Sequence, residues 1–415
     1  MSSTQPVSMK KAILFYIISS LFLIFEMAVQ VSPSVMTNDL MRDLNIGAFA
    51  LGLMSGFYFY TYTLMQIPSG LLFDKYKPRT IISFSILICA LGSFIFGFAT
   101  NYYFGCIARL LTGFGSAFAF VSVLVVASDL FHNKYFALLT GITQMLAAFG
   151  AMLGQMPVSM LVNTFGWRHT MFLLALIGVV LTILVWLLMN YEKQGQMQCH
   201  FSKEPKITAS LKTVIQSPQT WMIALYACLL WAPMSGFASL WGVQFLTKAD
   251  HLTANAAAFY CSFMWLGLAL ASPLLGLLAN ALNSKRMPLI LSALLGAISF
   301  ACILELPLSG LILGILLACA GASCSGQALS FALVRDNNAY SIKGTAIAFN
   351  NMAVVISGAI VQPLIGHLIS DSTLDSVKNY ALADYKKGLM VILIAYIAAT
   401  FTSIFLIKEN KSASN

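Results

Sequence analysis

The chain has 415 residues, of which 59% are hydrophobic and 9% are charged. Soluble proteins carry about 25% charged residues, and one hydrophobic core stops growing at roughly 250–300 residues, so this composition excludes a single large soluble domain. The net charge is +9. Because the basic residues gather between apolar runs, the charge does not point to nucleic acid.

Twelve apolar runs follow one another along the chain, and each is close to the about 20 residues that cross a bilayer as a helix. The sequence therefore predicts an all-α membrane protein with twelve transmembrane helices. Their approximate limits are 11–36, 46–70, 80–99, 102–130, 137–161, 170–190, 219–246, 255–280, 287–305, 309–335, 342–369 and 388–407.

Twelve spans put both termini on the same side of the membrane. Most of the 23 basic residues fall on that side, and the positive-inside rule makes it the cytoplasmic side. The longest strongly polar connection, residues 191–217, separates six spans from six. We expect an N-terminal bundle over 1–190, a cytoplasmic linker over 191–217 and a C-terminal bundle over 218–415.

The two halves repeat each other. Three pairs of residues are separated by the same 206 positions, and they are Gly70 and Gly276, Asp74 and Asn280, and Pro157 and Pro363. Each pair falls at matching places relative to the spans. A constant interval of this kind indicates duplicated six-helix bundles.

The segment 70–79 reads Gly-x-x-x-Asp-Lys-x-x-x-Arg and resembles the signature between the second and third spans of the major facilitator superfamily. The segments 109–115, Arg-x-x-Thr-Gly-x-Gly, and 165–168, Phe-Gly-Trp-Arg, are also similar to elements of that family. The sequence departs at Lys77, where the family has Gly, and at Thr80, where it has a base. The resemblance covers the whole chain and implies two pseudo-symmetric six-helix bundles.

In that family the segment after span 2 acts as a conformational latch between helices that separate during transport. Gly70 would allow two helices to approach closely at the membrane edge, and Asp74 would accept backbone hydrogen bonds at a helix end. Asn280 lacks the charge, so we expect a weaker second latch. The latch residues implied by the resemblance are Gly70, Asp74, Lys75, Arg79, Gly276, Asn280 and Arg286.

Ionisable residues inside spans are costly and are by default functional. Glu26 lies in span 1 and Arg109 in span 4. The resemblance implies that spans 1, 4, 7 and 10 line a central cavity, which lets both residues face it and each other. A purely structural pair is the alternative. If functional, Glu26 is the candidate proton acceptor and Arg109 the candidate partner of a carboxylate. With a zwitterionic substrate, Glu26 would meet the ammonium and Arg109 the carboxylate.

Further polar and aromatic residues within the spans describe a small cavity with few charges, although helix packing explains any single one equally well. They are Tyr58, Tyr62, Gln66, Gln144, Trp231, Trp241, Gln244, Trp265, Gln327, Asn350 and Asn351. The sequence has no catalytic nucleophile motif, no Walker A loop and no C-x-x-C pair. We therefore expect no enzyme, no cofactor and no metal site.

The predicted function is secondary active transport in a bacterial inner membrane, by alternating access. Proton-coupled uptake of a small polar nutrient comes first, with an amino acid as the preferred substrate. The stretch from Gln30 to Met41, with the one that follows it, resembles a proteobacterial branch that includes amino-acid and nucleoside importers of intracellular pathogens. The alternatives are a carrier of a siderophore or other organic anion, and a non-transporting membrane sensor or scaffold. We expect a monomer, with protons, a small molecule and the lipid bilayer as partners.

Overall fold

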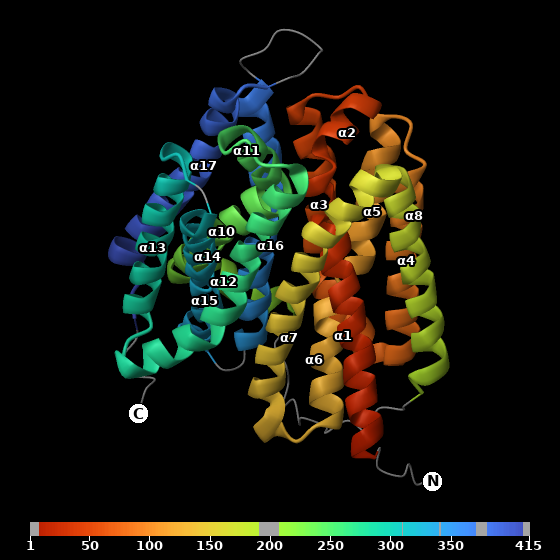
Figure 1. The fold of residues 1–415 in the computed structure, drawn as a ribbon. Coiled ribbons are helices and arrows are strands. Elements are labelled where there is room, and N and C mark those ends of the chain that lie inside the picture. Colours follow the sequence, from red (N-terminus) through yellow and green to blue (C-terminus); the bar gives the residue numbers. More distant parts are fainter. Residues whose placement is uncertain (1–7, 191–206, 309, 340–341, 371–379, 410–415) are drawn as a thin grey trace. The chain divides into compact units, whose positions relative to one another are not determined.

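The protein was analysed as a computed structural model that describes residues 8–190, 207–308, 310–339, 342–370 and 380–409. Every regular element in these ranges is helical (Figure 1). The first half contains α1 (Met9–Val31), η1 (Ser32–Val35), α2 (Thr37–Asp43), α3 (Ala48–Lys75), α4 (Pro78–Gly97), α5 (Tyr102–Ser116), α6 (Ala119–Leu130), α7 (Asn133–Leu153) and α8 (Met156–Leu188).

The second half is helical in the same way. Its elements are α9 (Ile207–Gln216), α10 (Pro218–Pro233), the π-helix η2 (Met234–Trp241), α11 (Gly242–Ala249), α12 (Ala254–Ala281), α13 (Arg286–Glu305), α14 (Gly310–Ser323), α15 (Gly326–Asp336), α16 (Lys343–Ser370), α17 (Leu382–Phe401) and the π-helix η4 (Thr402–Leu406).

Ten stretches of the described chain are long and apolar enough to cross a membrane. The 51-residue stretch Leu138–Leu188 holds two crossings, because the chain leaves the helical conformation at Gly166, where φ is 78°. This left-handed conformation is open to glycine at no steric cost. The 28-residue helix α3 adds one more crossing, and the prediction of twelve transmembrane helices is confirmed.

Several spans contain breaks that the apolar pattern did not indicate. The predicted span 102–130 is divided into α5 and α6, and the predicted span 309–335 into α14 and α15. The predicted span 219–246 passes through the π-helix η2, which begins directly after Pro233. Proline removes a backbone donor, and wide π turns accommodate such interruptions. Hydropathy does not respond to these local changes of pitch.

The segment after span 2 also differs from expectation. The sequence placed a loop from residue 70 onwards, but α3 continues as helix to Lys75, and α12 likewise continues to Ala281. Helices α3 and α12 both have 28 residues, and their first residues are 206 positions apart. The internal repeat therefore extends from single residues to whole helices.

The chain divides into two compact units, residues 1–32 with 57–202 and residues 33–56 with 203–415. In the first unit, α1 packs against α6 and α7, and α4 packs against α5 and α8. In the second unit, α10 packs against α16, and α12 packs against α14. The three-part division at 190 and 217 stays a prediction, since the linker residues 191–206 lie outside the described ranges.

Large apolar side chains cover outward-facing surfaces of several helices. Phe84 on α4, Ile298 on α13 and Leu311 on α14 are 61%, 64% and 79% exposed. Such exposure is unfavourable in water but is what a lipid solvent requires. Polar side chains are instead found among the buried residues of each unit, and these positions define the candidate site.

Candidate functional site

A buried carboxyl group lies in the middle of the first unit. Glu26, on α1, is 1% exposed, and its Oε1 accepts a short hydrogen bond from the hydroxyl of Tyr58 on α3. The Tyr58 hydroxyl also lies 3.5 Å from Oε1 of Gln30. Glu26 also interacts with the side chains of Ser116 and Arg109, and electrostatically with Tyr62 and Cys89.

A buried guanidinium lies on the other side of Tyr58. Arg109, on α5, is 4% exposed, and its Cζ is 4.7 Å from the centroid of the Tyr58 ring. Its Nη2 donates a long hydrogen bond of 3.4 Å to the backbone carbonyl of Gln30, whereas its Nε has no hydrogen-bond partner in the described part of the chain. A buried charge with an unused donor is costly.

Close helix packing fixes this arrangement. A Cβ atom added at Gly154 would lie 2.6 Å from the carbonyl oxygen of Ala28, so α7 and the chain after it approach α1 closely. A Cβ at Gly113 would collide with the carbonyl of Tyr58, and Thr61 Oγ1 donates to Leu110 O at 2.9 Å. Small residues thus let the backbones of α3 and α5 touch beside Arg109.

The structure brings Glu26 and Arg109 together, but not as the direct pair that the sequence suggested. Among the described residues, the two form no ion pair with each other, and the Tyr58 side chain connects them. The ring face of Tyr58 attracts the cation while its hydroxyl occupies the carboxyl group. Gln30, which the sequence reasoning missed, completes the cluster; an amide inside an apolar run was the available signal.

The remaining candidates of the first unit lie near this cluster or apart from it. Tyr62 is one turn from Tyr58 on α3, with ring centroids 5.7 Å apart. Gln66 follows one turn later and interacts with Tyr62. Gln144, on α7, is half-buried. The face of α3 that carries Tyr58, Tyr62 and Gln66 is therefore continuous with the buried charges.

The second unit has a buried polar cluster of its own, centred on η2 and α16. Gln362 is 1% exposed, its Nε2 donates to the carbonyl of Ser235 at 2.8 Å, and Trp241 Nε1 donates to the carbonyl of Gln362 at 3.1 Å. The hydroxyls of Ser235 and Ser357 are 3.0 Å apart. The sequence reasoning selected Trp241 but missed Gln362, although an amide before an intrahelical proline was visible.

The other predicted residues of the second unit are mostly buried and only partly satisfied. Asn350 donates to Ser330 Oγ at 2.7 Å, but its Oδ1 has no partner among the described residues, and the same holds for Gln244 Oε1 and Trp265 Nε1. Gln327 is 6% exposed. Trp231 and Asn351 are half-buried. These groups are all neutral.

The proposed latch residues of the first unit lie at the end of α3 and the start of α4. A Cβ added at Gly70 would meet no described atom within 4 Å, and the latch role of this segment stays a prediction. Lys75 is exposed, and the Arg79 guanidinium stacks on Trp186 with its Cζ 4.2 Å from the ring centroid. The side chain of Asp74 lies outside the described part of the chain.

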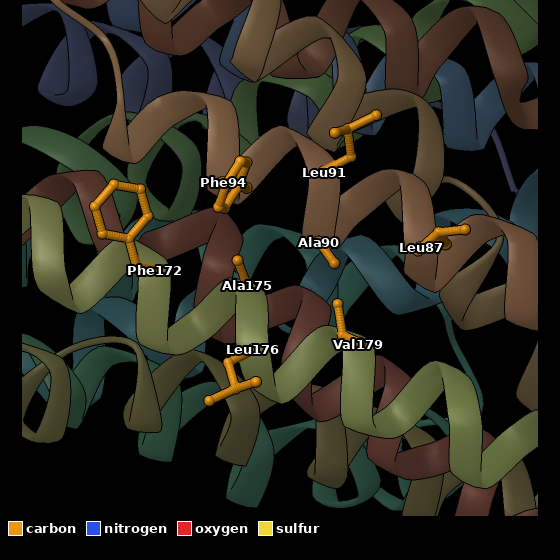
Figure 2. Close-up of a pocket in the computed structure, with 8 residues that line it drawn as sticks. All are labelled: Leu87, Ala90, Leu91, Phe94, Phe172, Ala175, Leu176 and Val179. Atoms are coloured by element: carbon orange, nitrogen blue, oxygen red, sulfur yellow. The ribbon is translucent and has the colours of Figure 1, made fainter.

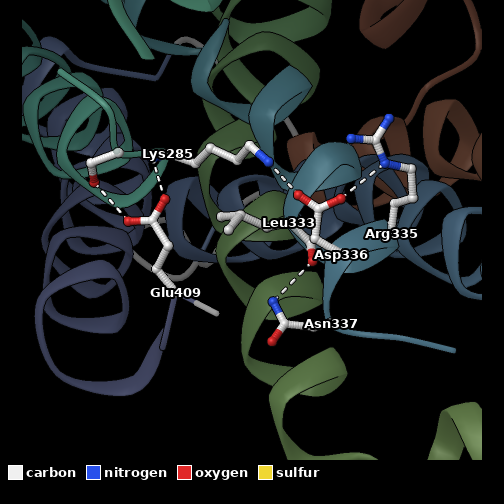
Figure 3. Close-up of polar contacts among 7 residues, drawn as sticks. Lys285, Leu333, Arg335, Asp336, Asn337 and Glu409 are labelled. Atoms are coloured by element: carbon white, nitrogen blue, oxygen red, sulfur yellow. Dashed lines mark hydrogen bonds and ion pairs between the residues drawn. The ribbon is translucent and has the colours of Figure 1, made fainter. Parts of the chain in front are cut away.

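At the corresponding end of the second unit, basic residues of the repeat contact two acids that the repeat did not indicate, Asp336 and Glu409. A Cβ at Gly276 would also meet no described atom within 4 Å, and Asn280 is exposed. Figure 3 shows instead that Lys285 pairs with Asp336 and that Glu409 accepts hydrogen bonds near the start of α13. Arg286 donates to the carbonyls of Ser403 and Ile404. Asp336 on α15 and Glu409 after η4 thus stabilise the turn that precedes α13.

Hydrogen bonds set the charge of Glu409, which lies outside the spans. Partial burial alone would raise its pKa, but bonds from the Lys285 backbone N–H and the Ser284 hydroxyl, with the nearby Lys285 charge, lower the pKa below its usual range. The carboxylate also lies at the N-terminal end of α13, where the helix dipole favours an anion. This end of the second unit is therefore stabilised by an ionised side chain.

Comparison with known proteins identifies the family of the chain. The Major Facilitator Superfamily sequence profile matches residues 18–373. The benzoate transport protein of Acinetobacter baylyi is 24% identical over 390 residues, which cover 85% of this chain and 83% of that protein. The probable galactarate/D-glucarate transporter GudP of Bacillus subtilis is 24% identical over 216 residues, or 50% of this chain and 45% of that protein.

The chain thus spans less than half the length of the galactarate/D-glucarate relative that it matches. A solved structure, the bacterial homologue of the human lysosomal transporter Spinster in an inward-facing and unoccupied conformation, aligns with a TM-score of 0.78. The sequences are 16% identical, and the alignment covers 96% of this chain and 97% of the other. With the family profile matched across most of its length and a fold of many membrane-spanning helices, the chain is a member of the major facilitator superfamily.

Proposed function

We propose that the chain is a proton-coupled carrier of a small organic anion, with Arg109 as the partner of a substrate carboxylate and Glu26 as the proton acceptor. The observation that carries the proposal is the buried guanidinium of Arg109, whose Nε has no hydrogen-bond partner in the described ranges and whose bond to the Gln30 carbonyl is long, at 3.4 Å. A carboxylate would supply the missing acceptors, and planar guanidinium groups bind carboxylates in a bidentate manner.

The substrate class follows from the same geometry. A zwitterionic amino acid would need an acidic group for its ammonium, but the carboxyl group of Glu26 is already engaged by the Tyr58 hydroxyl. The relatives are named for benzoate and for galactarate and D-glucarate, which are all carboxylates. An organic acid therefore replaces the amino acid that the sequence reasoning preferred.

Proton coupling is supported by the position of Glu26. A carboxyl group this deeply buried changes its proton occupancy when its surroundings change, and Tyr58 links it to the proposed anion partner. Binding an anion at Arg109 would alter the electrostatic environment of Glu26. Taking up a proton together with the anion would keep the buried site close to neutral.

The remaining features of the proposal come from the sequence. The positive-inside pattern supports a bacterial inner membrane with both termini in the cytoplasm. We also propose two halves joined by residues 191–217 and a monomeric state. The segments 70–79 and 276–286 would act as conformational latches. Membership of the importer branch suggested by residues 30–41 stays a prediction.

The test is uptake into proteoliposomes loaded with an alkaline interior. Radiolabelled benzoate, galactarate and an amino acid such as glutamine would be offered in parallel, and binding would be measured by thermal shift; a ligand at 100 times its Kd adds about 2.7 kcal/mol to stability. We expect accumulation of a carboxylate that depends on the pH gradient. Accumulation of glutamine with no response to either acid would overturn the proposed substrate class.

A further inference from the structure

A continuous seam runs between α4 and α8 in the first unit. The two helices are antiparallel, because the contacts between them advance along α4 while they go back along α8. The Arg79 guanidinium meets Trp186 at 4.2 Å, a Cβ at Gly178 would lie 2.8 Å from Ala90 Cβ, and the ring centroids of Phe94 and Phe172 are 5.6 Å apart. Every step of the seam is thus defined by a contact.

The deeper part of this seam is an open apolar groove. Figure 2 shows the carbon-only side chains that line it from both helices, and the volume is about 300 Å³. Its lining residues are Leu87, Ala90, Leu91, Phe94, Phe172, Ala175, Leu176 and Val179. Five of them, Leu87, Leu91, Phe94, Leu176 and Val179, are between 39% and 59% exposed. The groove therefore opens outward, away from the buried charges of the candidate site.

The other end of the seam is cationic. Arg79 is the second residue of α4, and Trp186 is two residues before the last residue of α8. Both thus lie at the end of a span, where tryptophan is typically found at the level of the lipid headgroups. Arg79 Nε has no hydrogen-bond partner among the described residues. Three of the four charged residues from 74 to 79 are basic.

The spacing between the cationic end and the groove matches a phospholipid. Leu87 and Phe94 follow Arg79 by eight and fifteen residues, which corresponds to about 12 Å and about 22 Å along a helix. The hydrocarbon core is about 30 Å thick, so the groove lies at the depth of acyl chains while Arg79 lies at the depth of phosphates. One molecule can therefore occupy both ends.

We propose that the α4–α8 seam binds an anionic phospholipid, with its phosphate on Arg79 beside Trp186 and one acyl chain in the groove. The positive charge of the 75–79 segment attracts anionic headgroups, and the groove excludes polar ligands because it offers carbon atoms alone. The inference concerns a surface of the first unit and does not depend on which substrate the carrier transports.

Native mass spectrometry of the purified protein tests the proposal, with dioleoyl phosphatidylglycerol and dioleoyl phosphatidylcholine as probes. We expect the wild-type protein to retain phosphatidylglycerol in preference to phosphatidylcholine. Arg79→Gln should weaken phosphatidylglycerol binding about fivefold, since one basic residue near the surface contributes about that factor, and should weaken phosphatidylcholine binding less, because the choline cation offsets the charge of its phosphate. Arg79→Lys should restore most of the preference.

The groove is tested separately by a variant on the lipid-facing surface. The result then does not depend on whether the Arg79→Gln protein folds correctly. Val179→Phe narrows the groove and should lower the retention of both lipids. Ile298→Phe, at another exposed apolar position on α13, is the matched control and should have no effect. Equal retention of the two lipids by the wild-type protein, or equal behaviour of Val179→Phe and Ile298→Phe, would overturn the proposal.

Discussion

The two units bury different kinds of polar side chain on a repeated scaffold. Within the ranges that the structure describes, the buried charged residues are Glu26 and Arg109, both in the first unit. The second unit buries amides, among them Gln244, Asn350 and Gln362. Helices α3 and α12 share their length and their spacing, so the repeat preserves the backbone while the ionisable groups differ.

This difference separates two tasks that a carrier must perform. A buried charge costs several kcal/mol unless it is compensated, so it persists where it binds an ion or a proton. Neutral amides can instead accept hydrogen bonds at a lower cost, and the oxygens Gln244 Oε1, Asn350 Oδ1 and Gln362 Oε1 have no hydrogen-bond partner among the described residues. Proton and anion chemistry would then belong to the first unit, and neutral hydrogen bonding to the second.

The largest expected effect concerns Glu26. Glu26→Gln should abolish uphill uptake and leave substrate exchange intact, because glutamine resembles the protonated acid and cannot release a proton. Accumulation driven by a pH gradient and counterflow exchange would be measured in the same proteoliposomes. Glu305→Gln is the control, since Glu305 is exposed and pairs with Lys386 at 3.3 Å. Normal accumulation by the Glu26→Gln protein would show that Glu26 is not the proton-coupling residue.

Arg109 should determine affinity. Arg109→Lys should weaken the Kd for a carboxylate about tenfold to a hundredfold, because a hydrogen bond to a charged group contributes about 1.5–3 kcal/mol and a lysine cannot form the planar fork. Isothermal titration calorimetry with the best carboxylate from the uptake screen would give the Kd. An unchanged Kd in a correctly folded Arg109→Lys protein would make Arg109 a structural residue.

Tyr58 should separate the two roles within the cluster. Tyr58→Phe removes the hydroxyl that donates to Glu26 but keeps the ring beneath Arg109. Carboxylate affinity should therefore stay within about threefold, since the cation–π contact is worth about 0.5–2 kcal/mol and is retained, while the pH profile of uptake should change. A large loss of carboxylate affinity with an unaltered pH profile would contradict the assignment of the Tyr58 hydroxyl to proton coupling.

Gln362 tests the second unit. Gln362→Leu loses the bond to Ser235 O but also removes an oxygen that has no partner in the described part of the chain, so the unfolding free energy should change by no more than about 1 kcal/mol. Denaturation in detergent would measure it, and the pH dependence of uptake should match the wild type. A changed pH dependence would contradict the separation of tasks between the units.

The smallest effect is expected at Glu409. Its pKa is lowered in the folded protein, so its stabilising contribution is present above the pKa of an unfolded glutamate, about 4.3, and is lost as the pH falls through the lower folded value. Glu409→Gln should therefore have a lower Tm than wild type at pH 7, and the difference should shrink on acidification. Glu305→Gln again serves as control, and a difference that grows at low pH would exclude this explanation.

Much of the fold could be predicted from the sequence because its determinants are local. Apolar runs of the length of a bilayer define the spans without knowledge of their neighbours, and the interval of 206 residues revealed the repeat. The breaks within spans were missed, as at η2 after Pro233, because a π turn depends on packing against α16. The extension of α3 to Lys75 was missed because charged residues at a span end are compatible with either a helix or a loop.

The sequence alone determined that Glu26 and Arg109 are the unusual residues of this chain, because a charge in an apolar run is costly wherever it lies. Tertiary structure alone decided their relation, since Tyr58 lies between them and comes from a different helix. It also decided that Glu409 and Asp336, and not Asn280, hold the turn before α13. Contacts between residues that are tens to hundreds of positions apart depend on side-chain placement to within about an ångström, and no spacing in the sequence encodes it.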